Sequence, residues 1–193
     1  MSDGSLSLHA RSLKYGRLEN GCAIAVPPLL IKRLKQHFVT LPCGVDVILG
    51  TNGTVWMTET VTDAEFRAAV GDGAAASTEA GSEAPAAGGD GTATGGLAYD
   101  DATAAEAGVA EAIERRKAYA AGRVLTPDAR SRLARVHNAI AILRGAFLPV
   151  SPDTITAIVD AVGAGVSVAD MLTVEHATRL AAVAAAAAAA GGV

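Results

Sequence analysis

The segment Arg11–Arg17 holds the side chains best suited to contacting a nucleic acid. Arg11, Lys14 and Arg17 place three cations within seven residues, and Tyr15 lies among them. Guanidinium and ammonium groups bind phosphates, and a tyrosine ring can stack on a base. A solvated surface loop has a similar composition, so RNA or DNA contact by these residues is a hypothesis.

The histidines and cysteines do not have the spacing of a metal or redox centre. They are His9, His37, His137, His176, Cys22 and Cys43. No pair shows CxxC or HxxxH spacing, which favours packed or surface residues over zinc ligands. Nothing around Cys43 indicates the lowered thiol pKa that a nucleophile needs. The sequence also lacks Walker, strand-initiated GxGxxG and GxSxG motifs. We therefore expect no catalytic residue, no bound metal and no cofactor.

Charge and composition narrow the class of protein. The formal net charge is −4, but residues 1–50 carry +3, residues 51–114 carry −11 and residues 115–193 carry +4. Basic segments can attract phosphate backbones, although a mixed solvated surface would look the same. Alanine supplies 43 of the apolar residues and buries little area, which predicts a small core. The absence of a secretory signal or a strongly apolar run favours an intracellular protein without membrane contact.

The clearest local pattern is a β-hairpin centred on Asn52-Gly53. Strand-like runs at Val45–Leu49 and Thr54–Thr58 flank this pair. Asn-Gly is the favoured pair for a two-residue type I′ turn, because both central residues need positive φ. Such a turn predicts that Leu49 lies opposite Trp56.

The same turn formally matches the GxxG loop with which KH domains clamp a nucleic-acid backbone. A working clamp lies between helices, whereas this sequence lies between strands and lacks a basic residue. We therefore interpret Gly50, Asn52 and Gly53 as a structural turn.

Other segments have strand-like or helix-like patterns. Cys22–Val26 is a short predicted strand. Leu29–Phe38 is predicted to be a helix whose Leu30, Leu34 and Phe38, four residues apart, share a buried face. Another helix is expected over residues 107–120.

Two later helices begin with one shared signal. Thr126-Pro127-Asp128 and Ser151-Pro152-Asp153 each offer an N-cap hydroxyl, proline at the first helical position and an acid in the first turn. The first helix has an apolar stripe at Leu133, Val136, Ile140, Leu143 and Phe147. The second has one at Ile155, Ile158, Val159 and Val162. A third helix is expected from about Ser167, fraying into the alanine tail.

Two further segments have a composition or pattern of their own. Residues 71–105 consist mainly of Ala, Gly, Ser, Thr and acids, which predicts a disordered insertion. Ser5–His9 alternates like a half-buried strand, behind an Asp3-Gly4 pair that is typical of a hairpin turn.

Two stretches resemble one known family. They are Asp3-Gly-Ser-Leu-Ser-Leu-His-Ala-Arg-Ser-Leu-Lys-Tyr-Gly-Arg-Leu18 and Leu41-Pro-Cys-Gly-Val-Asp-Val-Ile-Leu-Gly-Thr-Asn-Gly-Thr-Val-Trp56, and Lys32-Arg33 and His37-Phe38 between them are also similar. The family is ribosomal RNA-processing protein four, an RNA-binding cap subunit of the eukaryotic RNA exosome. The resemblance is dense from Asp3 to Met57 and weaker but collinear from Val124 to about Leu180.

The resemblance implies an α+β fold: a KH-like domain with a short sheet packed on helices, preceded by a remnant strand of an OB-fold domain. In this family the KH domain carries a GxNG signature in place of a working clamp, and here it falls on Gly50, Asn52 and Gly53. Met1 aligns inside the OB barrel. Most of the barrel, which carries the family's principal RNA surface, is therefore expected to lie outside this sequence.

The resulting organisation has five parts. They are the last OB strand (1–18), the first part of the KH-like domain (19–70), a disordered Ala/Gly-rich insertion (71–106), the helical remainder of the KH-like domain (107–180) and a poly-Ala tail (181–193).

The function implied is that of a non-catalytic RNA-binding cap subunit of the RNA exosome. Such a subunit stabilises the ring and guides RNA, and so supports 3′-to-5′ RNA degradation and rRNA processing. The expected partners are RNA and the other ring and cap subunits, in the nucleus, nucleolus and cytoplasm. The alternative is a degenerate KH scaffold that contacts proteins and no RNA.

Overall fold

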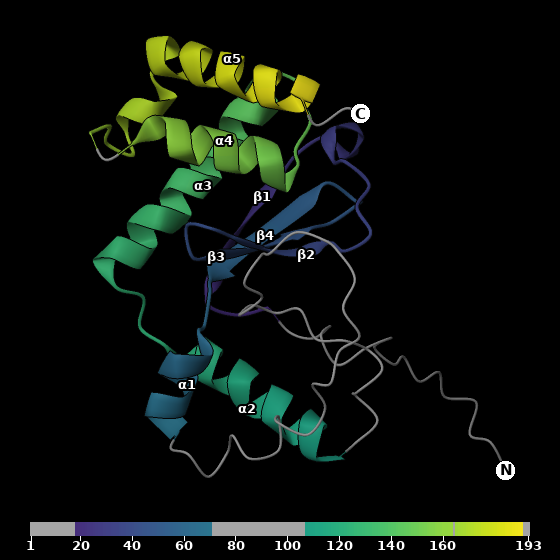
Figure 1. The fold of residues 1–193 in the computed structure, drawn as a ribbon, viewed down its shortest axis with the longest axis vertical. Coiled ribbons are helices and arrows are strands. Elements are labelled where there is room, and N and C mark those ends of the chain that lie inside the picture. The colour runs from purple at the N-terminus through teal and green to yellow at the C-terminus, as the bar shows by residue number, and fades with distance from the viewer. Residues whose placement is uncertain (1–17, 71–106, 164, 191–193) are drawn as a thin grey trace, which may run out of the picture.

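Within the residues that the structure describes, 18–70, 107–163 and 165–190, four antiparallel strands form one sheet with the order β1-β4-β3-β2. The structure is a computed structural model, drawn in Figure 1. The strands are β1 (Gly21–Ala25), β2 (Phe38–Leu41), β3 (Val45–Leu49) and β4 (Thr54–Glu59). A single 3₁₀ turn, η1 (Pro28–Leu30), lies between β1 and β2.

Among the described helices, α3 (Pro127–Gly145), α4 (Pro152–Val162) and α5 (Val174–Ala190) lie on one side of the sheet (Figure 1). Helix α3 contacts β1, β3 and β4, α4 contacts β2, and α5 packs on both helices. A 3₁₀ turn, η4 (Asp170–Leu172), precedes α5. Helices α1 (Asp63–Val70) and α2 (Ala107–Gly122) lie at the opposite side in this view. The α+β fold expected from the sequence is confirmed.

The core lies between the sheet and helices α3 and α4. Alternate strand residues point into it, because successive side chains of a strand face opposite sides. The buried strand residues include Val45, Val47, Leu49, Val55 and Met57, and the buried helical residues include Val136, Ile140, Leu143, Ile155 and Ile158. Each such side chain contributes about 1.5–3 kcal/mol when fully buried, so these two layers hold the fold together.

The predicted starts of α3 and α4 are confirmed. The Thr126 side chain accepts a hydrogen bond from the Ala129 backbone N–H at 3.2 Å. Ser151 and Thr154 form a capping box, in which each side chain bonds the other residue's backbone N–H. An N-cap of this kind contributes about 1 kcal/mol, so the two helices begin where their sequences specify.

The end of β4 is joined to the helices by a charged network. Glu59 accepts a hydrogen bond from Arg132 of α3 at 2.8 Å, and an oxygen of its carboxylate lies 3.2 Å from Arg123. Asn20 donates hydrogen bonds to the carbonyls of Ala120 and Arg123, at 2.9 and 2.8 Å. The sheet and the α2–α3 connection are therefore held together by polar contacts.

The helix predicted over Leu29–Phe38 is wrong. Between η1 and β2 no residue is helical, and Ile31 is extended and forms a parallel bridge with Val150. The Val150 N–H donates to the Leu30 carbonyl at 2.7 Å, and the Lys32 N–H donates to the Val150 carbonyl at 3.2 Å. These bonds occupy backbone groups that a helix would use internally, so pairing with a distant segment overrides local helix propensity.

The predicted β3–β4 hairpin is present, but its predicted register is wrong by one residue. Leu49 lies opposite Val55, and Ile48 lies opposite Trp56. A one-residue change of register moves side chains to the other face of a sheet. Trp56 therefore points away from the core that contains Leu49.

The later helices also depart from the sequence predictions. Phe147 follows the end of α3, has a φ of 54° and is 75% exposed, so it does not extend the apolar stripe. The last helix begins at Val174 rather than near Ser167, and it continues through the alanine run to Ala190. Ala184 is fully buried, so the alanine run is helical and packs against the core at this position. No described helix combines the length and apolar content needed to cross a bilayer.

Helix α1 was missed by the sequence analysis. The predicted insertion, residues 71–105, and the predicted strand at Ser5–His9 lie outside the described residues.

Candidate nucleic-acid interface

The β3–β4 turn contains the three glycine and asparagine positions of the GxNG signature. The Gly50 N–H donates to the Thr54 carbonyl at 2.9 Å, which leaves a three-residue loop of Thr51, Asn52 and Gly53. A loop of this length places a residue of positive φ at its third position. Gly53 has a φ of 90°, and Asn52 has no positive φ. The predicted type I′ geometry at Asn52 is therefore wrong.

Each signature residue has a structural role in this turn. A Cβ on Gly50 would lie 2.6 Å from the Asn52 Oδ1 and from the Thr54 carbonyl oxygen. The Asn52 Oδ1 accepts a hydrogen bond from the Thr54 N–H at 3.0 Å. A Cβ on Gly53 would lie 2.3 Å from the Val26 carbonyl oxygen, because Val26 donates its N–H to the Gly53 carbonyl at 2.8 Å. The turn thus holds the β1–η1 connection against the sheet.

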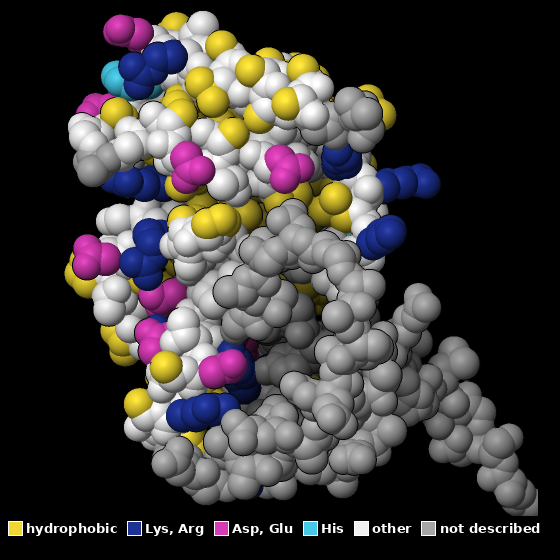
Figure 2. All heavy atoms as spheres, viewed as in Figure 1, with side chains coloured by type: hydrophobic (Ala, Val, Ile, Leu, Met, Phe, Trp, Pro, Cys, Tyr) yellow, Lys and Arg dark blue, Asp and Glu magenta, His cyan; other side chains and the backbone are white. Residues whose placement is uncertain are grey.

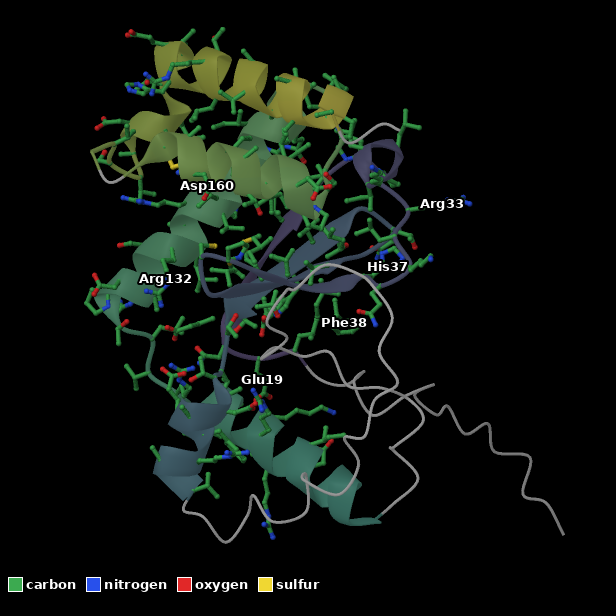
Figure 3. All side chains as sticks on the ribbon, in the orientation of Figure 1. Glu19, Arg33, His37, Phe38, Arg132 and Asp160 are labelled. Atoms are coloured by element: carbon green, nitrogen blue, oxygen red, sulfur yellow. The ribbon has the colours of Figure 1, made fainter. Side chains whose placement is uncertain are left out.

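The loop before β2 presents three cations. Lys32, Arg33 and Lys35 are all exposed, and the described sequence from Asn20 to Val45 contains no acid. Figure 3 shows Arg33 pointing away from the sheet. A group of basic side chains projects from the same side of the molecule in Figure 2 (right). Here we define Lys32, Arg33 and Lys35 as the basic loop.

The basic loop is held at both ends. At its start, the bridge between Ile31 and Val150 attaches it to the segment before α4. At its end, the His37 carbonyl accepts a hydrogen bond from the Leu49 N–H at 2.9 Å. Leu34 packs partly against the core between these points. The loop backbone is thus fixed relative to the sheet while Arg33 and Lys35 are exposed, an arrangement that suits binding of a phosphate backbone.

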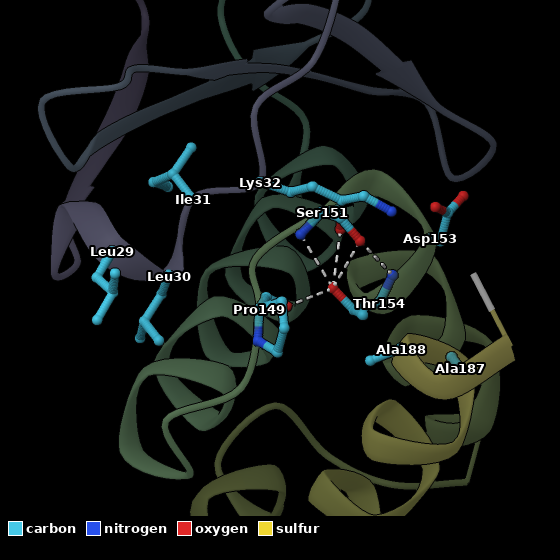
Figure 4. Close-up of a pocket in the computed structure, with 10 residues that line it drawn as sticks. All are labelled: Leu29, Leu30, Ile31, Lys32, Pro149, Ser151, Asp153, Thr154, Ala187 and Ala188. Carbon is cyan, nitrogen blue, oxygen red and sulfur yellow. Dashed lines mark hydrogen bonds between the residues drawn. The ribbon is translucent and has the colours of Figure 1, made fainter. Parts of the chain in front are cut away.

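A cavity of about 310 Å³ lies where the basic loop meets the helical layer (Figure 4). Its lining includes Lys32, the first turn of α4 and the alanines near the end of α5. The hydroxyls of Ser151 and Thr154 in this lining bond each other and the backbone within the capping box. These two hydroxyls therefore stabilise the start of α4.

A buried carboxyl group lies on the face of the sheet opposite the core. Asp46 is 4% exposed, and its Oδ1 accepts hydrogen bonds from Thr40 at 2.7 Å and Thr60 at 2.9 Å. Burial raises the pKa of Asp46, although the two hydroxyls and the nearby Arg116 oppose that rise. The carboxyl is thus buried and bonded to the Thr40 and Thr60 hydroxyls.

The cysteines are free thiols of intermediate exposure. Burial raises the pKa of both Cys22 and Cys43. A raised pKa lowers the fraction of thiolate, which is the nucleophilic form. Among the described residues, no group of three or more His, Cys, Asp or Glu side chains is arranged to hold a metal ion.

The residues that the sequence predicted to bind RNA lie outside the described residues. They are Arg11, Lys14, Tyr15 and Arg17. The basic loop was not predicted as a binding site, because Leu29–Phe38 was assigned to a helix with Leu30, Leu34 and Phe38 on its buried face. The run of basic residues without an acid between Asn20 and Val45 is the signal that could have identified it.

Comparison with known proteins assigns part of this region to a family. Residues 21–63 match the KH domain family. The match covers all four described strands and the basic loop, whereas α3, α4 and α5, which supply the helical side of the core, follow it in the chain.

Three curated relatives share this region. The Bos taurus exosome complex component RRP4 is 59% identical over 56 residues, which are 29% of this chain and 19% of that protein. The Schizosaccharomyces pombe exosome complex component rrp4 is 55% identical over 58 residues, 30% of this chain and 18% of that protein. The Saccharomyces cerevisiae exosome complex component RRP4 is 53% identical over 58 residues, 30% of this chain and 16% of that protein. The chain thus spans less than a fifth of the length of these relatives.

Proposed function

Since the resemblance to exosome component RRP4 proteins is confirmed over the KH region, we propose that this chain acts as a non-catalytic RNA-binding subunit of an exosome complex. The observation that carries the proposal is the identity of 53–59% with these three relatives over a segment that includes the GxNG turn and basic loop. The subunit belongs to the cap of the ring. It stabilises the ring and guides RNA for 3′-to-5′ degradation and rRNA processing by other subunits.

The chemistry of the described surface supports contact with the RNA backbone. The three exposed cations of the basic loop can neutralise phosphates, and they do so without reading the base sequence. We extend this proposal to Arg11, Lys14 and Arg17, which precede the KH region and carry the same charge, with Tyr15 available to stack on a base. We propose that the protein acts in the nucleus, the nucleolus and the cytoplasm.

A second candidate function is a protein scaffold that contacts neighbouring subunits and no RNA. The structural role of Gly50, Asn52 and Gly53 favours this candidate, because the turn that formally matches the clamp lies between strands. The two functions differ in how binding affinity depends on salt. Contacts with phosphates release counterions, so RNA affinity falls steeply as salt rises, whereas contacts with proteins in general release fewer.

The test is RNA binding by the full 193-residue chain and by a triple variant, Arg11→Ala, Lys14→Ala and Arg17→Ala. The variant should bind single-stranded RNAs more weakly, and the loss of affinity should be similar for RNAs of unrelated sequence. The slope of log K against log salt should become flatter by about two units, since each lost phosphate contact accounts for about 0.7.

A matched control removes three exposed cations elsewhere, at Arg67, Arg130 and Arg179. It should leave the salt slope unchanged. Assembly with the exosome ring should survive in both variants. Unchanged RNA affinity together with lost ring assembly in the first variant would favour the scaffold and contradict RNA contact by Arg11, Lys14 and Arg17.

A further inference from the structure

Two large apolar side chains that are exposed to solvent lie on segments that the backbone joins. Leu29, in η1, is 93% exposed, and Phe147, directly after α3, is 75% exposed. The Val150 N–H donates to the Leu30 carbonyl at 2.7 Å, so the chain just after Phe147 is bonded to the chain just after Leu29. This bond holds the two exposed side chains on neighbouring stretches of backbone.

Phe147 occupies a backbone position that glycine ordinarily fills. It follows the end of α3 with a φ of 54°, and the Leu148 N–H donates to the Leu143 carbonyl at 2.9 Å. This is the bonding pattern with which many helices end at a glycine. A residue with a side chain is strained at such a φ, and strain of this kind is frequent at functional sites. The fold thus retains a strained, exposed ring where glycine would fit without strain.

The cavity in Figure 4 adjoins these side chains. Leu29 and Pro149 are part of its lining, together with Ala187 and Ala188 of α5. Phe147 is two residues from Pro149, so their Cα atoms are at most about 7 Å apart. The cavity volume of about 310 Å³ is at the lower end for pockets that enclose a bound group. We call this cavity together with Leu29, Phe147 and Pro149 the apolar site.

The charges around the apolar site are positive on balance. Lys32 and Asp153 both line the cavity and carry opposite charges. Arg144, in the last turn of α3, is exposed and donates a hydrogen bond to the Ala25 carbonyl at 3.2 Å. Arg33 is exposed in the basic loop, directly after Lys32, and points away from the sheet in Figure 3. An occupant with carboxylates beside its apolar groups would complement these cations.

We propose that the apolar site binds an extended segment of a partner protein that carries bulky apolar side chains beside acidic residues. One apolar side chain enters the cavity against Leu29 and Pro149, and another covers the Phe147 ring. Carboxylates of the segment pair with Arg144 and Arg33. The aliphatic lining favours a protein over a nucleic acid, because bases stack on planar rings. The inference goes beyond the RNA-binding function proposed above and does not depend on it.

The test begins with a library of random twelve-residue peptides displayed on phage, which is selected against the full 193-residue chain. The enriched peptides should combine leucine, isoleucine or phenylalanine with aspartate or glutamate. Synthetic, fluorescently labelled copies then give the affinity by anisotropy. Leu29→Ser and Phe147→Gly should each weaken binding at least about tenfold, as expected when an anchoring side chain is removed from an interface.

Phe147→Gly also separates binding from folding. Glycine suits the positive φ at this position, so the variant should unfold at the same temperature as the original chain or higher, while it binds the peptide more weakly. The matched controls are Val124→Ser and Val174→Ser, which change apolar side chains that are 88% and 84% exposed elsewhere. Both controls should bind the peptide like the original chain.

The charge component is tested by Arg144→Gln. This variant should bind the enriched peptides about two- to fivefold more weakly at low salt, because it loses a pairing with a carboxylate at an exposed position. Arg179→Gln, at an exposed position of α5, is the control and should bind normally.

Three outcomes would overturn the inference. The first is that the library yields no specific binder, or yields binders without acidic residues. The second is that peptide binding survives both Leu29→Ser and Phe147→Gly. The third is that these two substitutions weaken the binding of ten-nucleotide oligouridine instead, since the site would then hold RNA. None of the three contradicts association with an exosome complex, which is measured separately.

Discussion

The indole of Trp56 lies over Gly21 of the neighbouring strand β1. A Cβ at position 21 would stand 2.6 Å from the indole Cζ2 and 2.5 Å from the Met57 carbonyl oxygen. The first of these atoms belongs to a side chain that can turn, but the second belongs to the backbone of the sheet. The absence of a side chain at Gly21 therefore sets both the position of the ring and the close approach of β1 to β4.

Gly21→Ala should displace the indole and destabilise the domain by about 1–3 kcal/mol, the usual effect of overpacking. Tryptophan emission should shift, since Trp56 is the sole tryptophan, and urea unfolding gives the stability. The matched control is Gly145→Ala at the end of α3, where an added Cβ meets nothing within 4 Å. The control should be neutral or stabilising by up to about 1 kcal/mol. Equal effects of the two substitutions would contradict the close packing.

Gly53→Ala should destabilise the domain by more than about 1 kcal/mol. Gly53 combines a φ of 90° with a Cβ position only 2.3 Å from the Val26 carbonyl oxygen, so the substitution adds backbone strain to a steric clash. Thermal or urea unfolding measures the change.

Two other variants separate these contributions. Gly163 has a φ of 61°, but a Cβ there would meet nothing within 4 Å. Gly163→Ala should therefore show the cost of backbone strain alone, which is a smaller loss of stability than that of Gly53→Ala. Asn52→Ala removes one exposed hydrogen bond and should have the smallest effect of the three, about 1 kcal/mol or less. If Asn52→Ala were the most damaging, the roles assigned within the turn would be wrong.

The sequence was sufficient for the elements whose signals are local. The alternating runs around Asn52-Gly53 specified the two strands, and the Thr126 and Ser151 signals specified the starts of α3 and α4. The register was predicted wrongly because the sequence Gly50-Thr51-Asn52-Gly53 is compatible with both a two-residue and a three-residue loop. Only the bond between Gly50 and Thr54 distinguishes them.

Features that depend on distant partners could not be predicted locally. The spacing of Leu30 and Leu34 is typical of a helix, yet backbone hydrogen bonds with Val150 replace the bonds that a helix would form here. The placement of Phe38 beside Ile48 and of Ile48 beside Trp56 likewise depends on the register of the sheet. The position of the basic loop could therefore be found only from the tertiary structure, even though its cations are visible in the sequence.

Asp46→Asn should gain stability relative to the original chain as pH rises from about 4 to 7. Burial raises the pKa of Asp46 in the folded protein above its unfolded value of about 3.9. The folded state therefore favours the protonated form, and the contribution of Asp46 to stability falls as pH rises through the folded pKa. Asparagine has no such transition.

Urea unfolding at several pH values checks this sign. Asp128→Asn, at an exposed position in the first turn of α3, controls for the general effect of removing a charge. A loss of relative stability by Asp46→Asn on raising the pH would show that the folded pKa lies below the unfolded value, contrary to our interpretation.

Glu59→Gln should destabilise the domain by about 1–3 kcal/mol, as expected when a partly buried charged hydrogen bond is lost. The Glu59 side chain is only 10% exposed and lies next to Arg132 and Arg123. Glu114 pairs with Lys117 on α2, and the Glu114 side chain is 65% exposed. Glu114→Gln should therefore destabilise the domain by less than about 1 kcal/mol. Equal losses for Glu59→Gln and Glu114→Gln, measured by urea unfolding, would mean that the network at the end of β4 does not join the sheet to the helices.

Association with an exosome complex can be measured by purifying the tagged chain from its own cells at native levels. Mass spectrometry then identifies the proteins that remain bound after a moderate salt wash. We expect recovery of the exosome ring subunits, in amounts comparable with that of the tagged chain. A stable, folded chain that recovers no ring subunit would contradict it.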